Sequence, residues 1–181
     1  AASTSKIKFS KIIESISDIN PVEGRLQSIG NIKNNSKVIL DYAHTPDALK
    51  YTLESIKEQF SQSSISIVFG CGGDRDKNKR AIMGKIANQY CDKVFLTDDN
   101  PRYENPKKIR NQIKKKIAKL KLVEIESRKR AIKIAIENLN SGDILLVAGK
   151  GHEIYQEYKG KKKIFSDKKY ILKEINSKNK K

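Results

Sequence analysis

Short apolar segments alternate with amphipathic segments along most of this chain, and this alternation restricts its fold more than any other feature. Apolar runs of strand length cover residues 38–40, 65–69, 94–96, 122–125 and 143–148. Between these runs, apolar residues recur at helical spacing, which predicts helices over 45–60, 79–90, 105–117, 130–139 and 166–175. Strands that alternate with helices build a parallel sheet with helices on both faces. We therefore predict an α/β fold, a Rossmann-like three-layer domain with a mostly parallel sheet.

Local signals mark where several of these helices begin. Thr45-Pro46-Asp47 supplies an N-cap, a proline at the first helical position and an acidic first turn. Asn105-Pro106 and Ser166-Asp167 are expected to cap two further helices. These signals fix the direction of the chain after the strands.

Three weaker expectations concern individual apolar residues and the two ends. In the helix over 79–90, spacing predicts that Ile82, Met83 and Ile86 face inward, and Ile164-Phe165 predicts an edge strand. Residues 6–19 are expected to form a helix that Pro21 and Gly24 end, so that residues 1–20 separate from a domain over 21–181. Residues 176–181 are expected to be a frayed, solvated tail.

The net charge of +17, from 38 Lys and Arg against 21 Asp and Glu, is open to two interpretations. One is a nucleic-acid-binding surface. The other is a lysine-rich surface without a specific anionic partner. The excess is mostly Lys and is spread along the chain, without basic motifs that alternate with aromatic residues. These observations favour the second interpretation, with no nucleic-acid partner.

The cysteines and the apolar runs restrict where the protein works. Cys71 and Cys91 lack further Cys or His at metal-ligand spacing, so we expect two ordinary thiols and no metal site. No apolar run approaches the length of a membrane span, and no apolar leader segment is visible. A cytoplasmic protein without a membrane partner is expected.

Polar and glycine-rich segments follow four of the predicted strands. Ligands of open parallel sheets bind beyond the carboxyl ends of the strands. The chemistry is therefore expected in segments 41–45, 70–79, 97–102 and 149–153. Segment 70–79 contains three glycines but matches neither the P-loop nor the G-x-G-x-x-G spacing, so it does not predict a triphosphate site. Its Arg75 offers a guanidinium to a carboxylate or phosphate, although a solvated turn fits the same residues.

Segment 98–102 by itself is typical of a turn before proline. As a binding element, Pro101 stiffens a loop in which Asn100 and Arg102 bind a carboxylate from two directions. Asp99 then caps the loop or meets an ammonium group. Both interpretations remain open from the residues alone.

The remaining two segments carry further candidates. Gly149 and Gly151 allow a sharp exit from a buried strand, and Glu153 is suited to pair with an ammonium group. His152 is expected to be a hydrogen-bonded structural residue, because no catalytic triad or carboxylate pair accompanies it. In segment 41–47, Asp41 is a candidate for a ribose, and Tyr42 or His44 for a nucleotide base.

Together, segments 41–47, 70–76, 99–102 and 149–153 occur in an order and spacing that resemble the C-terminal domain of the Mur ligases. Segments 21–25 and 166–167 also fit, so the resemblance covers about residues 6–175. It implies an ATP-dependent acid–amino-acid ligase of bacterial peptidoglycan synthesis, of the type that adds meso-diaminopimelate to UDP-MurNAc-L-Ala-D-Glu. Residues 1–20 would then be the end of the central ATPase domain, or a helix added to the protein.

The resemblance also implies roles for individual residues. Family positions that contact meso-diaminopimelate correspond to Arg75, Asp99, Asn100, Pro101, Arg102, Gly149 and Glu153. Family positions that contact ATP correspond to Arg25 and Asp41, with His44 and Lys150 as further candidates. ATP and Mg²⁺ would be held mainly by the central domain, whose P-loop this chain lacks, so this segment alone is expected to carry no catalytic residue and to be inactive. Its partners would be the ligase's own N-terminal and central domains.

Selectivity between diaminopimelate and lysine is expected to depend on Arg102. Family members that add lysine lack this arginine, and bound lysine would leave Arg102 buried and unpaired. Two alternatives remain. One is a related ligase that adds dipeptides, polyglutamylates folates or extends cyanophycin. The other is a non-catalytic, basic nucleotide-binding module.

Overall fold

The computed structural model describes residue 11 and residues 22–180, and its centre is a six-stranded sheet. The strand order is β1-β2-β6-β3-β4-β5. The strands are β1 (Gln27–Ser28), β2 (Lys37–Asp41), β3 (Ile65–Phe69), β4 (Lys93–Leu96), β5 (Leu122–Glu124) and β6 (Ile144–Ala148). All neighbours from β2 to β5 are parallel, and only β1 pairs antiparallel, with β2. The predicted fold class is confirmed.

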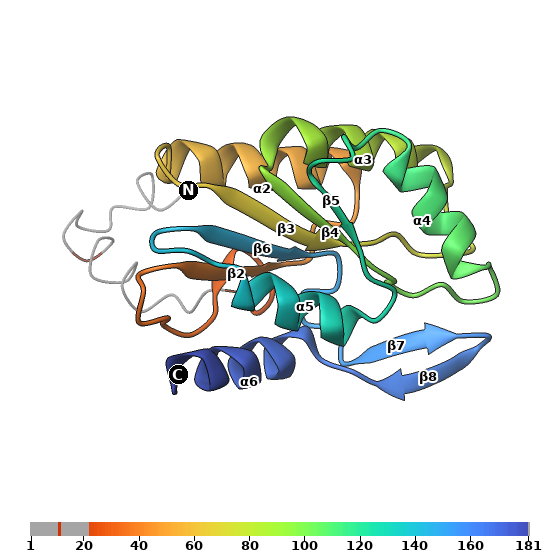
Figure 1. Cartoon of the computed structure of the whole chain (residues 1–181). Helices are drawn as coiled ribbons and strands as arrows, with labels where there is room; N and C mark the ends of the chain where they lie inside the picture. The colour runs from red at the N-terminus through yellow and green to blue at the C-terminus, as the bar shows by residue number, and fades with distance from the viewer. Residues whose placement is uncertain (1–10, 12–21, 181) are drawn as a thin grey trace.

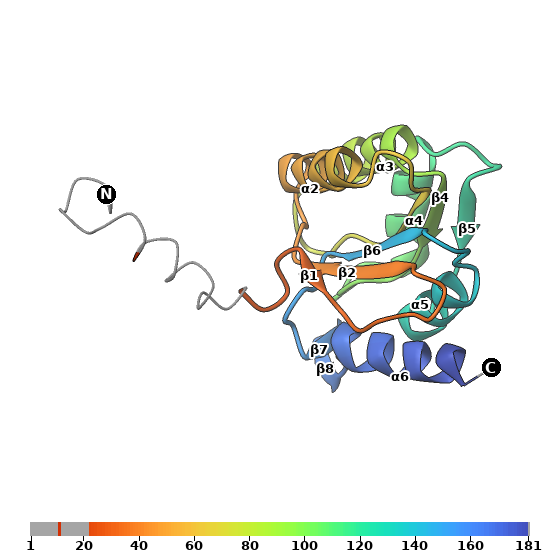
Figure 2. The same ribbon diagram turned by 90° about the vertical axis from the view of Figure 1, so that its left-hand side faces the viewer.

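Helices cover both faces of this sheet, which gives the three layers visible in Figures 1 and 2. On one face lie α2 (Pro46–Gln59), α3 (Asn78–Tyr90) and α4 (Pro106–Lys114). On the other lie α5 (Arg128–Glu137) and α6 (Asp167–Asn179). Each face has its own apolar core, and β6 lies between them with all five of its residues buried. A strand that is buried on both faces needs the continuous apolar run that its sequence shows.

The predicted caps are confirmed. The side chains of Thr45, Asn105 and Ser166 each accept hydrogen bonds from backbone N–H groups in the first turn of α2, α4 and α6. Each cap satisfies donors that a helix start leaves without partners. Thr45 and Asn105 end the loops that follow β2 and β4, so these two caps also fix where those loops turn into helices.

An antiparallel hairpin, separate from the main sheet, was not predicted. Strands β7 (Tyr155–Tyr158) and β8 (Lys161–Ile164) form a two-stranded sheet of their own and extend away from the layers in Figure 1. The edge strand predicted at 164–165 is only partly confirmed: Ile164 ends strand β8 of the hairpin and is exposed, whereas Phe165 lies outside the strand and packs in the core with α5 and α6.

Other expectations need smaller corrections. Ile82 is 49% exposed and does not face the core, whereas Met83 is buried and Ile86 packs against the core from its margin. Helix α6 continues to Asn179, so most of the expected tail is helical. The helix expected over 6–19 lies outside the described residues, apart from residue 11.

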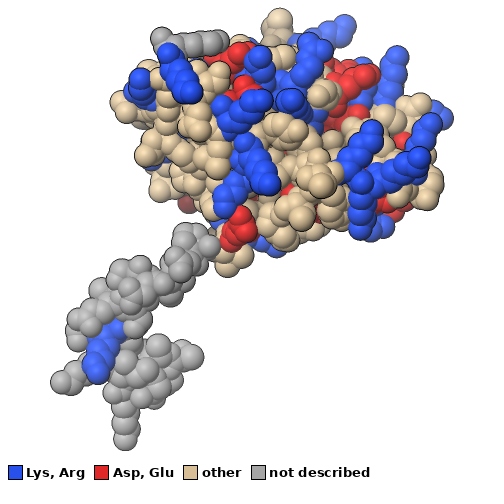
Figure 3. All heavy atoms as spheres, turned by 90° about the horizontal axis from the view of Figure 1, so that it is seen from below, with Lys and Arg blue, Asp and Glu red and all other residues tan. Residues whose placement is uncertain are grey.

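The basic surface is distributed. Figure 3 shows the face that carries α5 and α6, with lysine and arginine side chains spread over it and acidic groups among them. On this face no single basic patch stands out. Within the described part of the chain, no helix is long and apolar enough to cross a membrane.

Candidate functional site

The loops that follow β2, β3, β4 and β6 surround one cavity of about 530 Å³ at the carboxyl ends of these strands. This is the place that a parallel sheet predicts. Three cationic side chains line it, Arg75, Lys79 and Arg102, and three anionic ones, Asp76, Asp99 and Glu153. Asn100 and Gly149 also line the cavity. The structure thus brings together every residue proposed above to contact the amino acid, except Pro101. Pro101 is buried and does not line the cavity.

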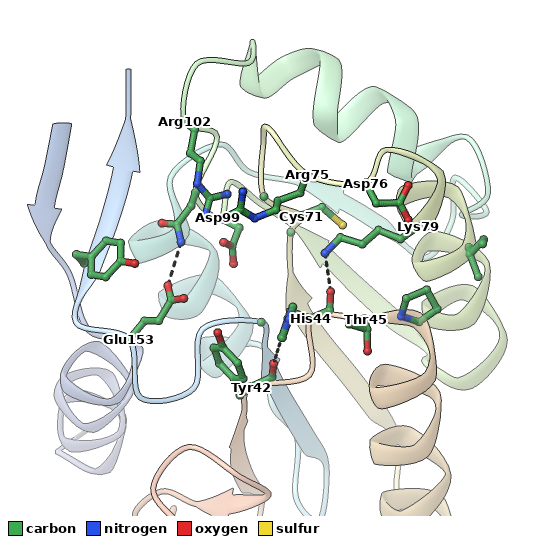
Figure 4. A pocket seen from close by; sticks show the side chains of 17 residues that line it. Tyr42, His44, Thr45, Cys71, Arg75, Asp76, Lys79, Asp99, Arg102 and Glu153 are labelled. Carbon is green, nitrogen blue, oxygen red and sulfur yellow. Dashed lines mark hydrogen bonds between the residues drawn. The ribbon is translucent and has the colours of Figure 1, made fainter. Parts of the chain in front are cut away.

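Two guanidinium groups form one wall of the cavity. Figure 4 shows Arg75 and Arg102 reaching toward one another from different loops, with Asp99 and Glu153 beneath them. Arg75 is exposed and donates one hydrogen bond to the carbonyl of Asp74 (3.1 Å), which leaves most of its donors open. Such a wall favours a ligand carboxylate.

Arg102 is held more firmly than Arg75. Its φ of 50° is in the left-handed region, and its backbone N–H donates to Glu157 in β7 while its carbonyl accepts from Lys159. One guanidinium nitrogen donates to the carbonyl of Gly73 (2.8 Å), and another lies 3.4 Å from the Glu157 carboxylate. Arg102 is therefore only partly buried and already paired, which corrects the expectation of a buried guanidinium left without a partner.

Asp99 lies on the floor of the cavity, against the backbone of Gly149. Gly149 has a φ of 108°, and a Cβ there would meet Asp99 Oδ2 at 3.1 Å. Behind them the fully buried Arg128 bonds both carboxylate oxygens of Asp167 (2.9 and 2.7 Å) and lies 3.9 Å from Asp99 Oδ2. Glycine at 149 is thus required both by the backbone and by the carboxylate beside it.

A triangle of side chains closes the opposite wall. The Asn100 amide donates to Glu153 Oε2, and the Lys150 ammonium donates to both Asn100 Oδ1 and Glu153 Oε2, each at 2.9 Å. Lys150 is 0% exposed and Asn100 2% exposed, whereas Glu153 reaches the cavity. The ammonium of Lys150 therefore lies behind the wall.

The residues proposed for ATP are only partly together. Arg25 lies over the Tyr42 ring (4.8 Å), and the rings of His44 and His152 lie 4.6 and 5.2 Å from that ring. This group forms an aromatic surface at the rim. Asp41 is buried beside this group and accepts hydrogen bonds from the N–H groups of Leu26 and Ala43, both 2.7 Å, so its carboxylate links the two segments that carry the group.

Sequence reasoning missed Lys79, Tyr155 and Arg128. Lys79 donates to the His44 carbonyl (2.8 Å) and links two loops at the cavity, while Tyr155 contributes an aromatic wall. Lys79 ends the segment 70–79 in which the chemistry was expected, but it was not singled out there. Arg128 gave no signal in the sequence, because its partner Asp167 is 39 residues away.

The loop that carries Asn100 and Arg102 rests on a buried polar network. Asp98 forms an ion pair with Arg110 and accepts a hydrogen bond from the Tyr158 hydroxyl (3.1 Å). Burial raises the pKa of Asp98 even so, and it also raises the pKa of Tyr158. Glu104 at the end of the loop accepts two bonds from buried Arg80, which lower its pKa to about 2. Ion pairs and hydrogen bonds therefore hold the loop at both of its ends.

The described residues contain no group of three or more His, Cys, Asp or Glu side chains that could hold a metal ion. The fold and the cavity define an α/β domain with a candidate site that is lined by charged side chains of both signs. The family described as Mur ligase, glutamate ligase domain, matches residues 24–151. The chain belongs to the Mur ligase family.

Individual relatives agree. A UDP-N-acetylmuramoyl-L-alanyl-D-glutamate–2,6-diaminopimelate ligase of Rickettsia typhi is 48% identical over 169 residues, which are 92% of this chain and 33% of the relative. The ligase of the same name from Chelativorans sp. is 45% identical over 157 residues, 87% of this chain and 32% of the relative. This chain thus spans about a third of the length of the curated relatives it matches.

Solved structures give the same result. A structure of a ligase with this name has a TM-score of 0.79 and 36% identity, covering 97% of this chain and 36% of that chain. The UDP-N-acetylmuramate-alanine ligase MurC of Thermotoga maritima has a TM-score of 0.61 at 22% identity, covering 83% of this chain and 32% of that chain. The second likeness shows the fold alone.

Proposed function

We propose that residues 21–181 are the C-terminal domain of a ligase that adds meso-diaminopimelate to UDP-MurNAc-L-Ala-D-Glu in peptidoglycan synthesis. The observation that carries the proposal is the cavity, in which Arg75 and Arg102 lie opposite Asp99 and Glu153. Diaminopimelate has two carboxylates and two ammonium groups. The names of the relatives described above support the same substrate.

The domain binds and orients the incoming amino acid. A guanidinium wall takes a carboxylate, and the carboxylates of Asp99 and Glu153 take an ammonium group. Lysine has no carboxylate at its distal carbon, so it would leave Asn100 and Arg102 without a ligand. The amino group of diaminopimelate must stay free to attack the activated D-glutamate carboxyl. The chemical contribution of this domain is therefore orientation.

ATP and Mg²⁺ would be held mainly by a central domain, and this domain would close over the nucleotide. ATP supplies the phosphoryl group that activates the D-glutamate carboxylate. On this side, the aromatic surface of Tyr42 and His44 with Arg25 fits a nucleotide base. The bonding of Asp41 and Lys150 favours an internal role for both.

The experiment is phosphate release by the full-length ligase with ATP, Mg²⁺ and UDP-MurNAc-L-Ala-D-Glu. One reaction contains meso-diaminopimelate, one contains lysine and one contains no amino acid. We expect turnover with diaminopimelate and only background in the other two. Turnover with lysine alone would refute the substrate assignment, and turnover with neither would refute the assignment to this reaction.

A further inference from the structure

We infer that Lys150 is a positioning residue for the amino-acid site, which fixes the orientation of the Asn100 amide and the free oxygen of Glu153. The inference rests on the proposed function and deepens it. It also departs from the expectation that Lys150 contacts ATP.

The position of Lys150 excludes direct contact with a ligand in this conformation. Its side chain is 0% exposed, and its ammonium group donates to Asn100 Oδ1 and Glu153 Oε2, both at 2.9 Å. The ring of Tyr155 lies 5.7 Å from the same nitrogen. Lys150 therefore acts on the cavity only through the side chains that it holds.

The first of these is Asn100. Its Oδ1 accepts from the Lys150 ammonium and from the backbone N–H of Glu157 (3.0 Å), two donors that cannot bond an amide NH₂. The NH₂ group must then face Glu153 and the cavity, where it serves as a donor. Without Lys150, Oδ1 would keep only the Glu157 N–H as a donor, and the NH₂ group would keep only Glu153 as an acceptor.

The second is Glu153. Its Oε2 accepts both from Lys150 and from the Asn100 amide, at 2.9 Å each, which leaves Oε1 as the acceptor for a ligand ammonium. The lysine also balances the carboxylate charge in a partly buried place. The Asn100 amide donor and the Glu153 Oε1 acceptor thus lie side by side in a fixed arrangement, as recognition of an amino-acid head group requires.

The test uses the full-length ligase with Lys150→Met, which keeps the length of the side chain and removes its charge and donors. We expect the KM for diaminopimelate to rise about tenfold to a hundredfold. The KM values for ATP and for the UDP-linked dipeptide should stay within about twofold. The preference for diaminopimelate over lysine should fall.

The matched control is Lys121→Met. Lys121 also donates to two internal acceptors, the carbonyls of Asn88 and Cys91, but it lies before β5 at the opposite edge of the sheet. It should leave all three KM values unchanged. A rise in the KM for ATP alone in Lys150→Met would overturn the inference in favour of a nucleotide contact. Equal changes in the KM values of Lys150→Met and Lys121→Met would show that Lys150 has only a general structural role.

A second comparison applies even if Lys150→Met folds poorly, because Lys150→Met with Glu153→Gln leaves no unpaired charge. The double variant should bind diaminopimelate more weakly than Glu153→Gln alone, since Asn100 Oδ1 then loses its bond to Lys150 and keeps only the Glu157 N–H. Equal affinities would show that Lys150 only balances Glu153, which refutes the role toward Asn100. Loss of the diaminopimelate preference in the unmodified ligase would instead refute the proposed function.

Discussion

The guanidinium group of Arg102 lies 3.4 Å from the carboxylate of Glu157, so the wall that faces the ligand already has an internal counter-ion. If the proposed function holds, a ligand carboxylate would join this pair and would not meet a bare cation. The penalty for binding lysine is smaller than that for an isolated buried guanidinium. Selectivity must then depend on the geometry of the fork as well as on its charge.

Replacing Arg102 by alanine in the full-length ligase should raise the KM for diaminopimelate about tenfold to a hundredfold, because a charge-assisted contact is lost. The KM for ATP should remain nearly unchanged. Arg102→Lys should give an intermediate value, since it keeps the charge but not the fork. Steady-state kinetics check this, with Arg130→Ala at an exposed position of α5 as the control. Equal losses for both substrates would contradict the assigned role.

Gly149→Ala should damage the amino-acid site and not only the fold. The backbone at φ 108° strains any side chain, and the new Cβ would lie 3.1 Å from Asp99 Oδ2. The strain should cost about 1–3 kcal/mol of stability. Gly142→Ala is the control, because Gly142 has a φ of 78° and a Cβ there would have nothing within 4 Å. Both variants should unfold at lower temperature, but only Gly149→Ala should raise the KM for diaminopimelate.

Glu104 should make stability depend on pH in the acid range. Hydrogen bonds from Arg80 lower its pKa from 4.5 to about 2. A lowered pKa contributes stability that is complete above the unfolded value and is lost as the pH falls from about 4.5 toward 2. Glu104→Gln should therefore be less stable at neutral pH, with a difference that shrinks on acidification. Urea unfolding at several pH values measures this, and Glu58→Gln at an exposed position of α2 serves as the control. A constant difference across this range would rule out the linkage.

The two thiols should be inert in the native protein. Cys71 is 4% and Cys91 1% exposed, and burial raises the pKa of Cys71 to about 12 and that of Cys91 further. Because the thiolate is the reactive form, iodoacetamide at about pH 8 should label neither until urea is added. Peptide mass spectrometry distinguishes the two sites. Fast native labelling of Cys71 that diaminopimelate prevents would show that the cavity opens more widely than in this structure.

The layers of the fold were predictable because local signals and the global arrangement agree. The apolar run of β6 and the caps at Thr45, Asn105 and Ser166 each lie within a few residues of the structure they specify. The hairpin of β7 and β8 was not predictable from alternation, since β7 is polar and half-buried and β8 is lysine-rich and exposed. It is tied instead to Arg102 by backbone hydrogen bonds across more than fifty residues of sequence.

The candidate site was likewise predictable only in part. That the loops after the strands meet at one edge was predictable from the parallel sheet, and Arg75, Asp99, Asn100, Arg102 and Glu153 do line one cavity. What lies behind the cavity was not predictable. The pairs Arg128–Asp167 and Arg80–Glu104 join residues 39 and 24 positions apart, and buried charges carry no periodicity that a single sequence reveals.

The backbone bonds between Arg102 and the hairpin have a consequence for protein engineering. Arg102 donates to Glu157 and accepts from Lys159, while the Asn100 amide oxygen accepts from the Glu157 N–H. Hydrogen bonds thus join the loop over residues 98–102 to β7, although the two come from distant parts of the sequence. Grafting segment 98–102 alone onto a lysine-adding ligase would transplant the side chains without their support. A graft that transfers the proposed substrate specificity would have to include segment 150–159 as well.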